Sequence, residues 1–192
     1  MSAEITPAKG VEAVMTASNR LFATTVICGA LLASPSYESA IAQTISVKTE
    51  YFMTVYLDLK EGFANGRLRI VDIPSGWVEG PRIKGKIIPP SGDWFTPLAS
   101  GVGRIGVRLI VQTDDNQIIY VSYNGIQQCS KEGDDRLSRG ELLKTDDCYF
   151  IVAPTFETTS ERYAWLNALQ AVGKMTELQR ANHIKYDFFV IK

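Results

Sequence analysis

The sequence predicts a mainly β protein: a small antiparallel β-barrel of about eight strands with one short helix. Apolar and polar residues alternate with period two over most of the chain after residue 44, which is typical of strands with one buried face. The alternating segments are joined by turn-type sequences, and no repeating strand–helix–strand pattern occurs, so a parallel sheet is not expected. Closure into a barrel removes the exposed edges of such a sheet. A barrel of about eight strands leaves room for one small ligand.

Three strands are predicted in the first half of the domain: Ile45–Leu59, Arg67–Ile73 and Trp77–Ile88. Lys60–Gly66 contains two glycines and an asparagine, and it is predicted to be a loop. Glycine and proline interrupt the third strand at Gly80, Pro81 and Gly85, which indicates bulges. Pro89–Gly92 is predicted to turn the chain.

Gly103–Tyr123 is the clearest hairpin, because apolar residues alternate regularly on both sides of the turn Thr113–Asn116. Asn124-Gly125 is expected to end its second strand. Further strands are predicted at Cys148–Val152, Ala171–Met175 and Ile184–Ile191. A short helix is predicted over Glu161–Leu169, with Thr159 or Ser160 as its cap.

The N-terminal 42 residues have the three parts of a secretory signal peptide. Arg20 precedes the apolar run Leu21–Ala33, whose 13 residues are too few to cross a bilayer of about 30 Å, and Ala40-Ile41-Ala42 provides small residues for cleavage. We therefore predict residues 1–42 to be a signal peptide cleaved after Ala42 and the protein to be secreted or periplasmic. A retained anchor helix and a buried core helix are the alternatives. Met15 is a second candidate start of translation.

Residues 43–192 are expected to form one domain of 150 residues, enough for a sizeable core. The whole chain carries 20 Lys and Arg against 21 Asp and Glu, and the predicted mature chain carries 18 of each sign. Its cations are scattered, so nucleic acid is not an expected partner. No membrane attachment is expected after signal cleavage. A small-molecule ligand is the expected partner, and the sequence leaves open a homo-oligomer.

Two cysteines remain in the predicted mature chain, Cys129 and Cys148, since Cys28 lies in the signal segment. An even number of cysteines in an exported protein favours a disulfide, which would close the polar excursion 129–148; two free thiols are the alternative. One histidine and two bridged cysteines leave no nitrogen–sulfur metal site, so no metal is predicted. No cofactor is predicted either, because the glycines of Gly101–Gly106 begin a strand instead of opening a helix.

Four residues are candidates for catalysis: Glu79, Asp93, Arg108 and Tyr120. Glu79 would share a strand face with Ile83 and Ile87, and a carboxylate among apolar neighbours is costly unless it is paired or protonated. A solvent-exposed Glu79 beside Arg82 is the alternative. Asp93 either acts as a second acid–base group or caps a turn. Arg108 and Tyr120, from the hairpin, would polarise the substrate.

Seven further residues combine aromatic surface with polar groups near these candidates. The candidate ligand-binding residues are Trp77, Arg82, Trp94, Tyr149, Glu157, Trp165 and Asn167. For Trp165 the alternative is a helical plug that closes the core.

Three segments together resemble one known family. They are GWVEGPRIKGKIIPPSGDW at 76–94, VRLIVQTDDNQIIYVSYNG at 107–125 and YFIVAPTFETTSERYAWLNALQAVG at 149–173. The chain resembles the DUF3237 family, also called UPF0311, over about residues 49–192. The resemblance implies a compact, single-domain, mostly antiparallel β-barrel, and it implies no established catalytic residues. Gly106 departs from the family pattern, which commonly has an aspartate there, two residues before Arg108.

These observations lead to three functional hypotheses. The first is a barrel that binds a small apolar or aromatic molecule and acts on it as a cofactor-independent isomerase, cyclase or hydratase. The second is a non-catalytic carrier of such a molecule. The third is a structural or interaction module whose interior is filled by side chains.

Overall fold

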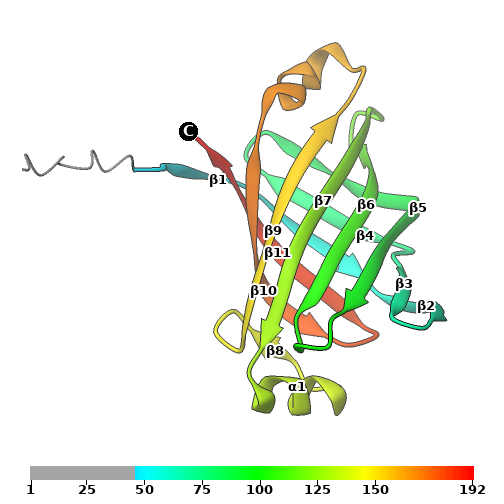
Figure 1. Ribbon diagram of the computed structural model, residues 1–192. Coiled ribbons are helices and arrows are strands. Elements are labelled where there is room, and N and C mark those ends of the chain that lie inside the picture. The colour runs from blue at the N-terminus through cyan, green and yellow to red at the C-terminus, as the bar shows by residue number, and fades with distance from the viewer. Residues whose placement is uncertain (1–45) are drawn as a thin grey trace, which may run out of the picture. The chain divides into compact units, whose positions relative to one another are not determined.

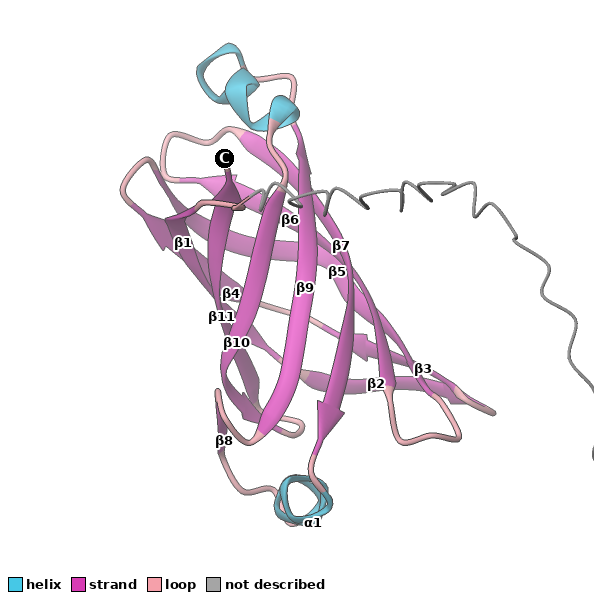
Figure 2. Ribbon diagram, turned by 60° about the vertical axis from the view of Figure 1, so that its left-hand side comes forward, coloured by secondary structure: helices cyan, strands magenta, loops and turns pink. Residues whose placement is uncertain are grey.

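The structure, a computed structural model, describes residues 46–192 as one antiparallel sheet with two short helices (Figures 1 and 2). The predicted signal peptide at 1–42 lies outside the described residues. The elements are β1 (Thr49–Asp58), β2 (Lys60–Asn65), β3 (Leu68–Asp72), β4 (Gly76–Gly80), β5 (Ile83–Pro97), β6 (Gly103–Thr113), β7 (Ile118–Cys129), α1 (Lys131–Ser138), β8 (Leu143–Lys144), β9 (Cys148–Glu157), the 3₁₀ helix η1 (Glu161–Ala168), β10 (Ala171–Gln179) and β11 (His183–Ile191). No helix among residues 46–192 has the length and apolar character needed to cross a membrane.

Eight strands close the barrel in the order β5, β4, β1, β11, β10, β9, β7 and β6, and β6 pairs with β5 again. The predicted fold class is therefore confirmed. The β2–β3 hairpin extends from the second half of β5, and β8 pairs with β10. Inward side chains form one apolar core, as the alternation predicts; in β6, Ile105, Val107 and Leu109 are buried, whereas Arg104 and Arg108 are exposed.

Strand β5 runs through the segment that was predicted to turn at Pro89–Gly92. Prolines 89 and 90 have no N–H group to donate, so regular pairing with β6 is interrupted there. Ile88 pairs with Ile110 and Gly92 pairs with Arg108, so β5 uses four residues where β6 uses two. The Ser91 hydroxyl bridges the irregularity, because it donates to the Ile88 carbonyl (2.8 Å) and accepts from the Ile110 N–H (3.0 Å). Two extra residues are an even number, so the inward and outward faces of β5 are kept.

The segment Trp77–Ile88 is two strands, not one. Gly80 pairs with Ile83 across a tight turn at Pro81 and Arg82, so β4 and the start of β5 form a hairpin. The expected common face of Glu79 and Ile83 is therefore wrong: Glu79 lies opposite Lys84 and faces outward, and Ile83 faces the core.

Three other segments contain more regular structure than expected. Residues 60–65 form β2, which pairs with β3 across a turn where Gly66 has a φ of 58°. β7 continues past Asn124 to Cys129, and a side chain at Gly125 would lie 2.6 Å from the Ile151 carbonyl oxygen, so glycine there permits close strand approach. The polar excursion contains α1, whose Ser130 cap accepts from the Gly133 N–H at 3.0 Å.

The helix η1 closes one end of the barrel, as the plug alternative proposed. Tyr163 and Leu166 are buried, and Trp165 packs against the core. The Tyr163 hydroxyl donates to Asp115 at 3.1 Å, which ties the plug to the β6–β7 turn. This end of the interior is therefore filled by side chains.

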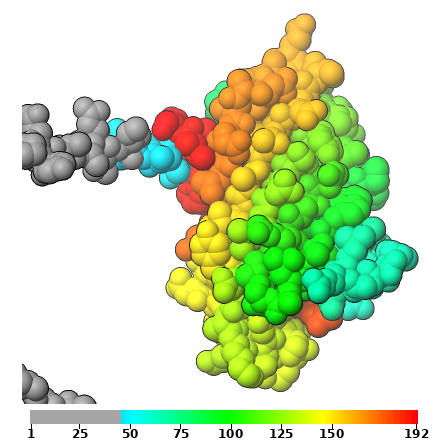
Figure 3. Space-filling view, in the orientation of Figure 1, coloured from blue at the N-terminus to red at the C-terminus, as the bar shows by residue number. Residues whose placement is uncertain are grey.

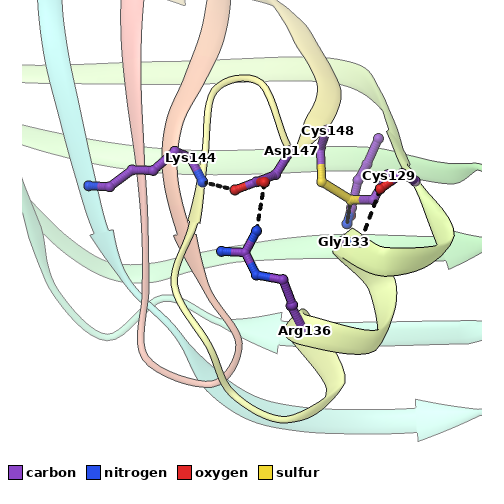
Figure 4. Close-up of a disulfide and its surroundings, with 8 residues drawn as sticks. Cys129, Gly133, Arg136, Lys144, Asp147 and Cys148 are labelled. Carbon is purple, nitrogen blue, oxygen red and sulfur yellow. Dashed lines mark hydrogen bonds and ion pairs between the residues drawn. A yellow bond between two sulfur atoms is a disulfide. The ribbon is translucent and has the colours of Figure 1, made fainter.

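The predicted disulfide joins Cys129 and Cys148, which lie directly opposite each other on β7 and β9 (Figure 4). It closes the base of the excursion that carries α1 and β8. Arg136 of α1 donates to Asp147 (2.7 Å), and the other Asp147 oxygen accepts from the Lys144 N–H (2.7 Å). The excursion is thus a compact cap with its own internal contacts.

We expect the double variant Cys129→Ser/Cys148→Ser to lose about 3 kcal/mol of unfolding free energy, because the bridge restricts the unfolded chain. Denaturant titration with and without a reducing agent measures this. The reducing agent should destabilise the wild type by a similar amount and leave the double variant unchanged. Equal stability of the oxidised wild type and the double variant would contradict the expectation.

Candidate functional site

A cavity of about 620 Å³ occupies the end of the barrel opposite η1. Its wall comes from the inward faces of β1, β5, β6, β7, β9 and β11, and its rim from β2, β3, α1 and the β10–β11 turn. Figure 3 shows the β2–β3 hairpin (turquoise) and α1 (yellow-green) at this end of the molecule. The volume is in the range of pockets that hold a small organic molecule. At the rim, Arg180 pairs with Glu61 of β2 at 3.8 Å.

Asp93 is the carboxylate of this cavity. It follows the irregular part of β5 and faces inward, opposite Val107 of β6. Its Oδ1 accepts a hydrogen bond from the Gly106 N–H at 2.9 Å, and no cation within residues 46–192 forms an ion pair with it. Partial burial raises the pKa of Asp93 to about 6, because less water stabilises its charge; the Gly106 hydrogen bond offsets part of this rise.

Two buried tyrosines, Tyr123 and Tyr186, line the same cavity. Tyr123 lies opposite Val107, so Asp93, Val107 and Tyr123 form one inward-facing row across β5, β6 and β7. The Tyr123 hydroxyl is buried and has no hydrogen-bond partner among the described residues. Burial raises the pKa of Tyr123 well above its usual value, and the nearby Asp93 carboxylate adds to the rise.

Aromatic contacts hold the two tyrosines in place. The rings of Tyr123 and Tyr186 meet edge to face with centroids 6.0 Å apart, and Phe188 and Phe150 pack on them in the same manner. Burial is also the main cause that raises the pKa of Tyr186 well above its usual value. Both phenols are therefore neutral donors at physiological pH, beside a carboxylate that exchanges its proton near neutrality. This arrangement can bind an oxygen-bearing molecule and transfer a proton within it.

Of the four predicted catalytic residues, only Asp93 lies in the cavity. Glu79 is on the outer surface, 3.4 Å from the Lys84 amine. Arg108 is also outside, with its guanidinium 5.1 Å from the ring centre of Trp94. Tyr120 faces outward opposite Glu157 of β9. The structure therefore does not bring these three residues together with Asp93.

The predicted ligand-binding residues lie on the outer surface or at the η1 end. Trp77 and Trp94 are 39% and 40% exposed, and Tyr149 is 61% exposed. Glu157 is exposed on β9. At the η1 end, the Arg82 guanidinium lies 3.6 Å from the ring centre of Trp165, and the Asn167 side chain hydrogen-bonds both backbone groups of Thr158 (2.8 and 2.9 Å).

A second pocket, of about 540 Å³, lies on the outside of β4, β5 and β6. Trp77, Glu79 and Lys84 are among its lining residues, so two predicted site residues do share a surface pocket. Because Glu79 is paired with an exposed lysine there, this pocket offers no desolvated group comparable to Asp93.

Sequence reasoning missed Tyr123 and Tyr186. Each occupies an inward position of an alternating run in which the neighbouring inward residues are apolar, such as Val121 and Phe188. The sequence signal that could have identified them was a hydroxyl group at a strand position expected to face the core. Among residues 46–192, no group of three or more His, Cys, Asp or Glu side chains is arranged to hold a metal ion.

Comparison with known proteins identifies relatives that are named UPF0311 proteins. A UPF0311 protein from Clostridium acetobutylicum is 33% identical over 101 residues. The match covers 53% of this chain and 64% of the relative, which is less than two thirds of the relative's length. A UPF0311 protein from Rhodopseudomonas palustris is 28% identical over 135 residues, covering 68% of this chain and 88% of the relative.

Solved structures share the barrel. The crystal structure of a conserved protein of unknown function from Rhodopseudomonas palustris matches with a TM-score of 0.72 and 27% identity, over 78% of this chain and 99% of that one. A β-barrel-like protein from Acinetobacter baumannii matches with a TM-score of 0.62 and 27% identity, over 79% and 99%. A protein described as an enzyme from Penicillium herquei, at 20% identity and a TM-score of 0.55 over 79% and 98%, shares the fold alone.

The family model described as "Protein of unknown function (DUF3237)" matches residues 38–191. This match covers all the described strands and all three segments on which the sequence resemblance rests. The chain belongs to the DUF3237 family.

Proposed function

We propose that the barrel binds a small, largely apolar molecule in the cavity and that Asp93 acts on it as a general acid–base, without a cofactor. The observation that carries the proposal is a half-buried carboxylate in a largely apolar wall, which forms no ion pair with a cation of residues 46–192. Such a group is costly to keep for stability alone, and its raised pKa suits proton transfer near neutral pH. Isomerisation, cyclisation and hydration all need such a transfer.

A non-catalytic carrier is the second candidate, and the volume and apolar wall of the cavity favour it equally. The two candidates differ in one respect. Binding alone does not need Asp93 to change its charge, whereas catalysis does. The disulfide suits export to an oxidising compartment, and with the predicted signal peptide it supports a secreted or periplasmic site of action.

Binding is tested with Nile red, an uncharged apolar dye whose fluorescence rises in a dry environment. We expect the wild type to bind it and Val107→Phe to weaken binding about tenfold or more, because the added ring occupies the cavity between Asp93 and Tyr123. Arg104→Phe places the same ring on the outer face of β6 and serves as the control. Equal binding by wild type and Val107→Phe would contradict a ligand in this cavity.

Acid–base catalysis is tested with a nitrobenzisoxazole, which eliminates to a coloured phenolate when a base removes its ring proton. We expect turnover that rises with pH through about 6, since the deprotonated carboxylate is the active form. Asp93→Asn should lower the rate about a hundredfold or more, and Glu79→Gln should retain it because Glu79 lies outside. Dye binding without any Asp93-dependent turnover would favour the carrier.

The charge on Asp93 should also reduce stability above neutral pH. Its folded-state pKa is raised from 3.8 to about 6, so its contribution to stability is present below about pH 4 and is lost as the pH rises through 6. We expect Asp93→Asn to be more stable than the wild type by up to about 3 kcal/mol at pH 8, and equally stable near pH 4. Denaturant titration at the two pH values measures the difference. Asp114→Asn, in an exposed turn, is the control, and an equal gain for Asp93→Asn at both pH values would refute the expectation.

A further inference from the structure

The Tyr123 hydroxyl belongs to a residue that lines the cavity. It is buried, and it has no hydrogen-bond partner within residues 46–192. Leaving such a group unpaired is unfavourable, and buried hydroxyls in proteins nearly always have a partner. The rings of Phe188 and Tyr186 pack against its ring in the free protein. A partner supplied by a bound molecule would remove this cost.

The position of Tyr123 relative to Asp93 restricts what that molecule can be. Both residues pair with Val107, from opposite sides, and both face inward. Neighbouring strands are about 4.8 Å apart, so the two Cα atoms are separated by about 10 Å across the cavity wall. A molecule lying over Val107 can therefore touch the carboxylate at one point and the Tyr123 side chain at another. Contact with the Tyr123 hydroxyl requires a small shift of the ring, because this oxygen is not exposed to the cavity in the free protein. The two contact points would lie a few bonds apart on the ligand.

The chemistry of the two groups is complementary. Asp93, when ionised, accepts a proton, and Tyr123 remains a neutral donor at physiological pH. The cations that line the cavity are Arg69 and Arg180 at the rim, and Arg180 is engaged with Glu61. Negative charge that develops on a ligand in the interior must therefore be stabilised by hydrogen bonds from neutral groups.

We propose that the molecule is a ketone with an acidic C–H bond near the carbonyl group, or the corresponding enol or phenol, and that its oxygen accepts a hydrogen bond from Tyr123. This inference rests on the proposed function and names the substrate class of the same site. Asp93 takes the proton from carbon, and the electron pair of the broken C–H bond forms a C=C bond while the carbonyl oxygen becomes an enolate. Tyr123 stabilises that oxygen. Return of the same proton to the oxygen gives the enol, which is an isomer of the ketone, so the reaction needs no further reactant.

Nitrophenols test the inference, because their phenolates are stable mimics of the enolate and their absorbance reports binding. We expect Tyr123→Phe to bind a nitrophenol about tenfold or more weakly than the wild type, since a hydrogen bond to a charged oxygen is lost. Tyr163→Phe removes another buried phenol at the η1 end and should bind normally. Asp93→Asn should bind the phenolate more tightly than the wild type, because a negative charge beside it is removed.

The stability of Tyr123→Phe provides an independent readout. A hydroxyl that pairs with nothing in the free protein can be removed without loss of a contact, so this variant should unfold at the same denaturant concentration as the wild type or at a higher one. A clear loss of stability would show that the hydroxyl has a structural partner, and the inference would then be wrong.

The outcomes separate this inference from the proposed function. Asp93-dependent turnover of the nitrobenzisoxazole with equal nitrophenol binding by wild type and Tyr123→Phe would overturn the substrate class and leave the acid–base function standing. Tyr123-dependent nitrophenol binding with no Asp93-dependent turnover would overturn the acid–base function and identify a carrier of phenols. Both dependences together support the inference.

Discussion

The hydrogen bonding of β5 to strands on both of its sides is the constraint on which the rest of the structure depends. Along one edge it pairs with β4 and then with β3, and along the other with β6, which closes the barrel. The two prolines interrupt this pairing, and the two extra residues leave the facing of the strand unchanged. An odd number would have turned Asp93 to solvent and Trp94 into the interior. The site therefore depends on how an irregular strand is accommodated, with Ser91 supplying the missing backbone partners.

The cavity concentrates the unfavourable features of the fold. The η1 end is filled by Tyr163 and Leu166, and its polar groups are paired, as the Tyr163–Asp115 contact shows. At the opposite end, no residue of 46–192 forms an ion pair with the Asp93 carboxylate or a hydrogen bond with the Tyr123 hydroxyl, and the wall around them is largely apolar. Exchange of either group for an apolar residue of similar shape would relieve a cost. Features that oppose stability and lie together in a cavity are the physical sign of a functional site.

Alternation along the chain was sufficient to predict the class of fold and the β6–β7 hairpin, and the capping residues Thr159 and Ser160 indicated the short helix, whose role as a plug was the alternative interpretation of Trp165. The predicted side-chain positions were wrong where a single turn decides which residues of a strand point toward the core. The tight turn at Pro81 and Arg82 separates Glu79 from the core, although a continuous strand would have kept it there. Tyr123 could not be linked to Asp93 from sequence, because their proximity comes from two successive strand pairings with Val107. The disulfide was predictable, since an even number of cysteines after the predicted signal peptide favours it.

The disulfide has a consequence for how members of this fold can diverge. Cys129 and Cys148 occupy paired positions on the adjacent strands β7 and β9. The disulfide therefore links the two ends of the excursion at a point where they are already neighbours in the barrel wall. The register of β7 and β9 is then independent of what the excursion contains. Insertions, deletions or a different helix between the two cysteines can therefore alter the rim of the cavity without disturbing the row of Asp93, Val107 and Tyr123. The composition of the rim can change separately from that of the barrel wall.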